Sequence, residues 1–183
     1  MTTATEPFTG AYTADPDHSS FQVELRHMGV GSFRTGFDEV EARLEPVAGG
    51  HRLVGRARVD SIGIKNPPEF RAHVVEGDEF FDAANHPYIS FESEELRLGR
   101  DGRVELQGTL TIKGVPKPLS AAGVYRAPLE DVYGAQRAAL DLTATIDRRD
   151  WGMGYQAQLP SGGDVLAWMV DVSVHLELVA EAA

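Results

Sequence analysis

The sequence predicts an all-β protein, an eight-stranded antiparallel barrel with one short helical insertion. Apolar and polar residues alternate in eight segments, short turns join nearly all consecutive segments, and only one stretch has helical character. Eight long strands linked by hairpins satisfy their edges best when the sheet closes into a barrel. A β-sandwich is the main alternative, because periodicity alone does not separate the two.

The first three predicted strands show the alternation clearly. Phe21, Val23 and Leu25 alternate with polar residues, as in a strand with one buried face. A turn at residues 29–32 leads to the second strand, and Ala48-Gly49-Gly50 closes a hairpin into the third. These strands are expected over residues 21–26, 34–44 and 52–59.

The pattern changes between the third and fourth strands. Residues 67–76 suit a short helix, because proline is tolerated in the first helical turn and acidic residues favour it. Asn85-His86-Pro87 then breaks the segment, since the residue before a proline is pushed out of the α region. Phe80 and Phe81 precede this break and Phe91 follows it. We therefore expect aromatic rings over one end of the sheet.

Five further strands complete the predicted barrel. Asp101-Gly102 is a hairpin signature, and Lys113-Gly114-Val115-Pro116 forms the next turn. An irregular glycine-rich loop precedes the last strand. The five strands are expected over residues 88–98, 104–112, 119–125, 140–146 and 166–178.

Small residues on the rows expected to face inward favour an internal cavity. An eight-stranded barrel is just wide enough to be filled by side chains or to hold one small ligand. Small side chains leave room in such an interior. The small residues expected inside are Gly55, Ala57, Gly108, Ala121, Gly123 and Ala144.

Length and composition bound the organisation of the chain. The 183 residues fit one domain, expected over residues 11–180 after a flexible tail at residues 1–10. No apolar run approaches the roughly 18 residues of a membrane-spanning helix, and the first residues lack the basic and apolar segments of a secretory signal. The expected location is therefore cytoplasmic. The net charge is 17 − 28 = −11, which disfavours nucleic acid as a partner.

The sequence contains no motif for a cofactor, a metal or a nucleophile. The chain has no cysteine, and no two of the six histidines have the helical spacing of a zinc site. Neither a nucleophile elbow nor a phosphate-binding glycine loop is present. The cluster Arg148-Arg149-Asp150 at a strand end is typical of a solvated rim; its functional interpretation is a guanidinium pair that recognises an anion at the barrel mouth.

Aromatic and methionine residues indicate a hydrophobic guest. Such residues are common in plain cores, but an apolar pocket with few polar groups is also what a long hydrophobic molecule requires. Met28, Trp151 and Met153 lie in or beside glycine-rich loops, where packing alone explains apolar residues less well. Flexible methionine suits guests of variable shape.

Several segments, taken in order, resemble the YceI family of lipocalin-like bacterial proteins that bind polyisoprenoids. The resemblance covers about residues 12–179. Its marks are Asp15-Pro16 with His18-Ser19, Arg26-His27-Met28-Gly29-Val30, Asp60-Ser61-Ile62, Arg71 and His73, Phe80-Phe81-Asp82 with His86-Pro87, Ile89-Ser90-Phe91-Glu92-Ser93, residues 108–115 with Lys117-Pro118, and Arg148-Arg149-Asp150-Trp151-Gly152. It implies an elongated barrel with a hydrophobic tunnel that holds an isoprenoid chain, such as that of a quinone or polyprenyl lipid. The resemblance also implies a possible homodimer, since dimers are common among such proteins.

Two functions from different classes follow. The first is a non-catalytic carrier or sequestering barrel for a long apolar isoprenoid-type molecule, without cofactor or metal. The second is a barrel enzyme, an isomerase or cyclase of a hydrophobic polyketide or terpenoid, with His27, His73 or Asp150 as the acid or base. A barrel with an interior filled by side chains is a third reading. The residues expected to contact a guest are Phe21, His27, Met28, Phe37, Phe70, Arg71, His73, Phe80, Phe81, Phe91, Arg149, Trp151, Met153 and Trp168.

Overall fold

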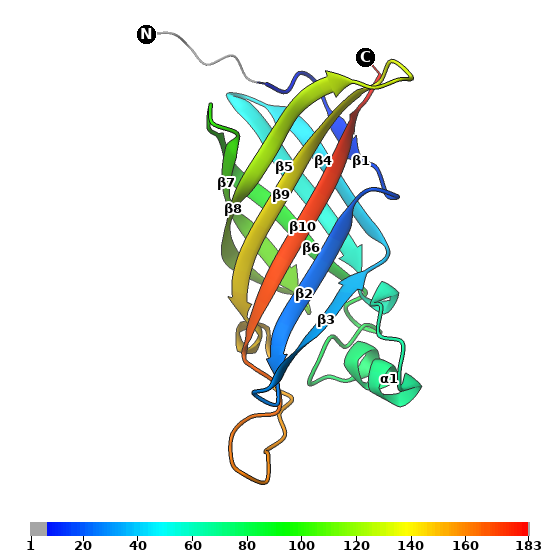
Figure 1. Cartoon of the computed structure of the whole chain (residues 1–183), viewed down its shortest axis with the longest axis vertical. Coiled ribbons are helices and arrows are strands. Elements are labelled where there is room, and N and C mark those ends of the chain that lie inside the picture. Colours follow the sequence, from blue (N-terminus) through cyan, green and yellow to red (C-terminus); the bar gives the residue numbers. More distant parts are fainter. Residues whose placement is uncertain (1–6, 183) are drawn as a thin grey trace.

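The computed structural model describes residues 7–182 and shows one antiparallel sheet of ten strands, in the order β1-β4-β5-β6-β7-β8-β9-β10-β2-β3 (Figure 1). An additional pairing of β1 with β10 closes the sheet. The strands are β1 (Tyr12–Ala14), β2 (Ser20–His27), β3 (Gly31–Phe37), β4 (Val40–Val47), β5 (Gly50–Arg58), β6 (Tyr88–Leu98), β7 (Arg103–Ile112), β8 (Val115–Glu130), β9 (Gln136–Asp147) and β10 (Met169–Ala180).

The ten strands form an eight-stranded barrel because two positions in the barrel wall are each occupied by two short strands, β1 with β2 and β3 with β4. β1 and β2 both lie beside β10, with Thr13 opposite Val179 and Val23 opposite Val172. β3 pairs with β2, and β4 pairs with β1 further along. The predicted closed eight-stranded antiparallel barrel is confirmed, and the sandwich alternative is wrong. The expected strand 34–44 is interrupted at Asp38, whose backbone N–H bonds the carbonyl of Ser61 instead of a neighbouring strand.

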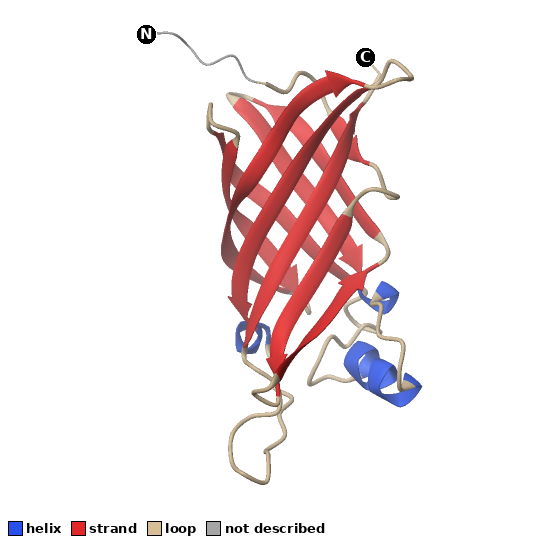
Figure 2. Cartoon of the chain, in the orientation of Figure 1, coloured by secondary structure: helices blue, strands red, loops and turns tan. Residues whose placement is uncertain are grey.

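The strand alternation sets the two faces of the wall. In β7, Val104, Leu106, Leu110 and Ile112 are buried, whereas Glu105 between them is exposed. Figure 2 shows that strands make up the whole wall and that the helices lie at one end of it, called here the lower end. The last strand begins at Met169, three residues later than the sequence predicted.

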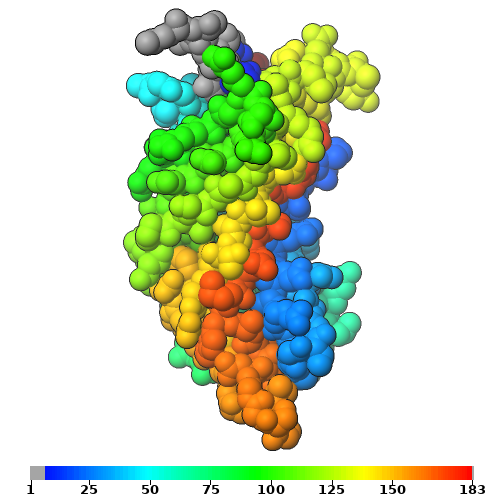
Figure 3. Space-filling model, turned by 60° about the vertical axis from the view of Figure 1, so that its left-hand side comes forward, coloured from blue at the N-terminus to red at the C-terminus, as the bar shows by residue number. Residues whose placement is uncertain are grey.

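The helical insertion lies where the sequence predicted it and covers the lower end. It comprises η1 (Val59–Ser61) and α1 (Pro68–Glu76), with a proline in the first turn of α1. A second short helix, η2 (Arg148–Trp151), follows β9 at the same end, and the loop of residues 152–168 projects beyond it (Figure 3). The cover is tied together by the backbone N–H of Tyr155, which donates to the Glu79 carbonyl at 3.3 Å. No helix among residues 7–182 is long and apolar enough to cross a membrane.

Phe8, which lies within the tail predicted over residues 1–10, packs into the upper end of the barrel. Its side chain is only 2% exposed, and its ring lies 5.4 Å from the ring of Tyr12 and 6.1 Å from that of Tyr125. Leu44 and Leu178 belong to the same buried cluster. Residues 1–6 of that predicted tail lie outside the described residues.

Two glycines expected to leave room inside the barrel have a different role. A Cβ atom on Gly123 would lie 1.8 Å from the backbone oxygen of Asp141, and one on Gly108 would lie 2.2 Å from that of Glu92. Neither glycine borders the cavity. They allow the backbones of neighbouring strands to approach closely, as strand glycines do elsewhere. Gly55, Ala57, Ala121 and Ala144 do border the cavity.

Candidate functional site

An apolar cavity lies inside the barrel. The volume open to the centre of a water-sized sphere is about 200 Å³, whereas one water needs roughly 10–15 Å³ by that measure. Leu110 of β7, Leu142 of β9 and Val172 of β10 line it, and Phe70 of α1 covers its lower end. The upper cluster around Phe8 closes the other end. The interior is therefore a hydrophobic chamber and not a filled core.

Half of the residues predicted to contact a guest line this cavity. The rings of Phe21 and Phe37 stack at 4.9 Å, and the ring of Phe81 meets that of Phe37 edge-on at 5.9 Å. These rings come from β2, β3 and the cover, so distant segments meet around one space. The predicted residues that line the cavity are Phe21, Phe37, Phe70, Phe80, Phe81, Phe91 and Met153. Their contact with a guest stays a prediction.

Three polar candidates do not border the cavity. His73 is exposed, with its ring against the rings of Phe80 and Tyr155. Arg71 donates a hydrogen bond to the backbone oxygen of Asp60. His27 forms a β-bridge with Leu166.

The remaining apolar candidates and Arg149 also lie outside the lining. Met28 is 43% exposed at the β2–β3 turn. Trp151 is buried in the lower core but does not border the cavity. The indole N–H of Trp168 donates to Asp164. Arg149 is exposed and pairs with Asp147 at 2.5 Å.

The structure brings Arg148, and not its neighbour Arg149, to the cavity. Arg148 is 4% exposed; its Nε donates to the carbonyl of Ala167 at 3.0 Å and its Nη1 to that of Met153 at 2.6 Å. Its guanidinium stacks on the ring of Trp168, 4.2 Å from the ring centre. Burial lowers the pKa of Arg148 below its usual value. A guanidinium nevertheless stays protonated in a protein, so this is a buried positive charge.

A signal for Arg148 was present in the sequence. The inward residues of β9, Leu142 and Ile146 among them, occupy even-numbered positions. Arg148 continues that row, while Arg149 falls on the outward row with Asp147. Strand parity therefore distinguishes the two arginines, although both lie in a short helix after the strand ends.

Thr35 is a polar residue with an unsatisfied atom at the cavity. Its Oγ1 is buried and has no hydrogen-bond partner. A buried hydroxyl without a partner costs about 1–3 kcal/mol. Replacing Thr35 by the nearly isosteric valine is therefore expected to raise the free energy of unfolding by about 1 kcal/mol in the empty protein. Chemical denaturation measures the change.

The control for this prediction is Thr109→Val, since the Thr109 hydroxyl donates to Glu94 at 3.1 Å. That substitution removes a made bond and is expected to be neutral or destabilising. A loss of stability in Thr35→Val would show that the hydroxyl is satisfied in the native protein.

Among residues 7–182, no histidine and only one carboxylate, that of Glu41, borders the cavity. Within residues 7–182 the ionisable residues that border the cavity are Glu41, Arg56 and Arg148. Glu41 and Arg56 are exposed and pair with each other at 2.8 Å. The acid–base candidates from the sequence, His27, His73 and Asp150, are not among the lining residues.

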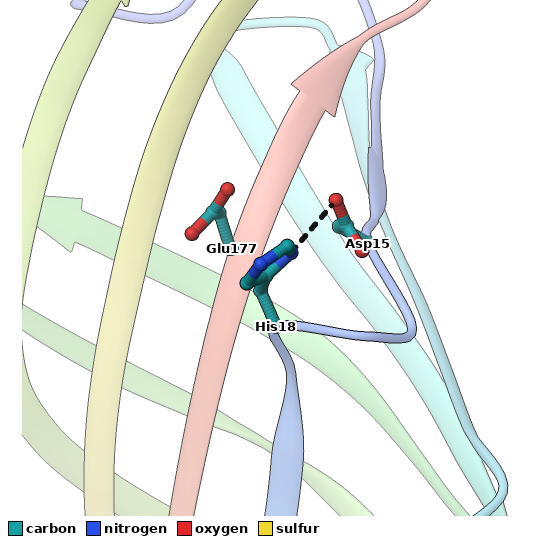
Figure 4. A group of neighbouring side chains, drawn as sticks. All are labelled: Asp15, His18 and Glu177. Atoms are coloured by element: carbon teal, nitrogen blue, oxygen red, sulfur yellow. Dashed lines mark ion pairs between the residues drawn. The ribbon is translucent and has the colours of Figure 1, made fainter.

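Asp15, His18 and Glu177 form a cluster on the outer surface near the β1–β2 break (Figure 4). Their ligand atoms lie within 4.8 Å of one another, a spacing that suits a metal ion. Arg137, however, already pairs with Asp15 at 2.8 Å and with Glu177 at 2.6 Å. A guanidinium thus supplies the positive charge that a metal would bring. These ion pairs link the segment between β1 and β2 to β9 and β10.

Acidic pH is expected to weaken the ion pair between Asp15 and Arg137. The guanidinium of Arg137 lowers the pKa of Asp15 to about 2, from 3.8 in the unfolded chain. The stabilisation is fully present above the unfolded value and is lost as the pH falls from about 4 to 2. Asp15→Asn is therefore expected to lower the free energy of unfolding by about 1–2 kcal/mol at pH 6 and by almost nothing at pH 2. Urea unfolding at both values tests this. An equal deficit at both would assign the effect to packing.

Comparison with known proteins agrees with this geometry. A closed antiparallel barrel around an apolar chamber defines a lipocalin-like barrel of the kind that binds hydrophobic ligands. The chain belongs to the YceI-like domain family, whose family model matches residues 12–182. A relative from Staphylococcus aureus (strain N315), UPF0312 protein SA2479, is 25% identical over 160 residues, which cover 85% of this chain and 89% of that protein.

Solved structures share the fold. BcnA of Burkholderia cenocepacia superposes with a TM-score of 0.72 at 17% identity, over 90% of this chain and 98% of that one. The YCEI protein of Campylobacter jejuni gives 0.70 at 17% identity, over 86% and 90%. A polyisoprenoid binding domain from Saccharophagus degradans gives 0.61 at 16% identity, over 95% and 100%. At these identities the likeness establishes the architecture.

Proposed function

We propose that this protein binds a long apolar molecule of isoprenoid type, such as a quinone or a polyprenyl lipid, inside its barrel. It acts as a carrier or sequestering protein and not as an enzyme. The observation that carries the proposal is the chamber itself, a cavity of about 200 Å³ bordered almost entirely by apolar side chains. Apolar surface removed from water contributes roughly 25 cal/mol per Å², so a long hydrocarbon gains affinity along its whole length.

The polyisoprenoid binding described for the Saccharophagus degradans domain supports this choice of guest. The lining favours it as well, since aromatic rings and branched aliphatic side chains accommodate an unsaturated, methyl-branched chain. The enzyme alternative requires a positioned acid or base at the guest, and its candidate residues border no part of the cavity. The cytoplasmic location and the homodimer stay predictions.

Native mass spectrometry of freshly purified protein, followed by organic extraction, tests the proposal. We expect a co-purifying isoprenoid quinone or polyprenyl lipid at close to one molecule per chain. Protein that carries no such molecule and also fails to take one up from a detergent solution would contradict the proposal. A bound guest that is chemically converted on incubation would favour the enzyme.

A further inference from the structure

Arg148 is a buried cation at a chamber that is bordered mainly by apolar side chains. It borders the cavity and is 4% exposed. Its Nε and Nη1 donate to the carbonyls of Ala167 and Met153, but Nη2 is buried and has no hydrogen-bond partner. The two bonds to the loop carbonyls already hold the side chain in place. Nη2 therefore takes no part in holding the side chain in place.

The charge of Arg148 has no direct ion-pair partner among residues 7–182, although the nearby carboxylates of Asp147 and Asp164 favour its charged form. The carboxylate of Asp147 is engaged by Arg149, and that of Asp164 accepts from Gln158 at 2.7 Å and from Trp168 at 2.8 Å. Within residues 7–182, Arg148 makes no ion pair. A buried charge without a partner is strongly unfavourable, and an unsatisfied N–H beside it adds to that cost.

We propose that Arg148 binds the anionic head group of the guest, a carboxylate or a phosphate, through Nη2. The head group then lies at the lower end of the chamber, and the tail extends along the rings of Phe21 and Phe37 toward the upper end. An anionic oxygen satisfies the free N–H and neutralises the charge at the same time, which a neutral hydrocarbon end cannot do. This inference rests on the proposed function and adds the chemical class of the head group.

Four probes with one shared tail separate the head groups: farnesoic acid, farnesyl phosphate, methyl farnesoate and farnesol. Each is titrated at pH 7.5, below its aggregation threshold, into delipidated full-length protein, and the dissociation constant is measured. We expect the acid, the phosphate or both to bind at least tenfold more tightly than the ester and the alcohol. A preference for only one of the two anions identifies the source of the head group.

The variants Arg148→Gln and Arg149→Gln form a matched pair. Arg148→Gln is expected to remove the preference for the anion while farnesol still binds, because the apolar walls are unchanged. Arg149→Gln, at an exposed residue paired with Asp147, is expected to keep the preference. Arg148 also holds two backbone carbonyls, so an Arg148→Gln protein that fails to fold leaves the wild-type series of four probes to decide alone.

The outcomes separate this inference from the proposed function. Equal affinity for all four probes, or tighter binding of the neutral ones, overturns the head-group assignment and leaves the isoprenoid carrier intact. A preference for the anion that persists in folded Arg148→Gln protein also overturns the assignment. The absence of binding by all four probes contradicts the proposed function itself.

Discussion

Replacing Phe8 with alanine is expected to lower the free energy of unfolding by about 3–5 kcal/mol. The ring is 2% exposed and closes the upper end of the barrel against Tyr12, His51 and Tyr125. Its removal leaves a void, because the surrounding strands are fixed by their ladders and cannot collapse into it. Urea unfolding followed by tryptophan fluorescence measures the loss.

Thr9→Ala is the control, since Thr9 is exposed and is the next residue in the chain. It is expected to change the free energy of unfolding by less than about 0.5 kcal/mol. A loss below about 1 kcal/mol in Phe8→Ala would mean that the segment before β1 does not pack onto the barrel in solution.

Replacing Ala121 with phenylalanine is expected to weaken guest binding by about a hundredfold or more, an energy of roughly 3 kcal/mol. Ala121 lies in β8 opposite Leu106 and borders the cavity. A ring at this position extends into the space that the guest needs. The dissociation constant of farnesol or of a short quinone, measured by fluorescence quenching, gives the result.

Ala122→Phe is the matched control. Ala122 is the next residue, is exposed and belongs to the outward row of β8. It gains the same ring outside the barrel and is expected to bind the guest as the unmodified protein does. Equal weakening in both variants would argue that binding takes place on the outer surface. Thermal unfolding of both variants shows whether the added ring has disturbed the fold.

The architecture could be predicted from the sequence because its main signal is local. A period of two along β7, β9 and β10, with short turns between strands, determines which side chains face inward. The helix at Pro68–Glu76 was signalled by its proline-rich start. These signals can be recognised without knowing the distant contacts. The barrel follows because eight strands joined by short turns satisfy their edges best when the sheet closes.

The structure differs from the sequence-based prediction where long-range contacts determine the local conformation. Phe8 is an isolated aromatic residue in a polar segment, so no periodicity marks it as buried. The break at Asp38 depends on a hydrogen bond to Ser61, which is distant in sequence. The close approach at Gly123 depends on Asp141 of the neighbouring strand. In each case the partner lies outside the segment whose pattern was read.

Only half of the predicted contact residues line the cavity, and the reason is again the difference between local and long-range signals. Aromatic residues within strands or the cover could be assigned to the chamber because their direction follows from strand parity or from the segment's position. The polar candidates Arg71 and His73 could not, because α1 does not preserve strand parity, whereas Arg148 continues the inward row of β9. His73 faces outward, and of the two adjacent arginines only Arg148 reaches the cavity.

The most direct test of the central claim is to map where a bound guest touches the protein. A farnesol analogue that carries a diazirine on its tail is bound to the wild-type chain and irradiated, and the labelled residues are identified by peptide mass spectrometry. We expect label on inward residues such as Leu110, Leu142 and Val172, which line the cavity. Label confined to outward residues such as Ala122 and Ser173 would show that the chamber does not hold the guest.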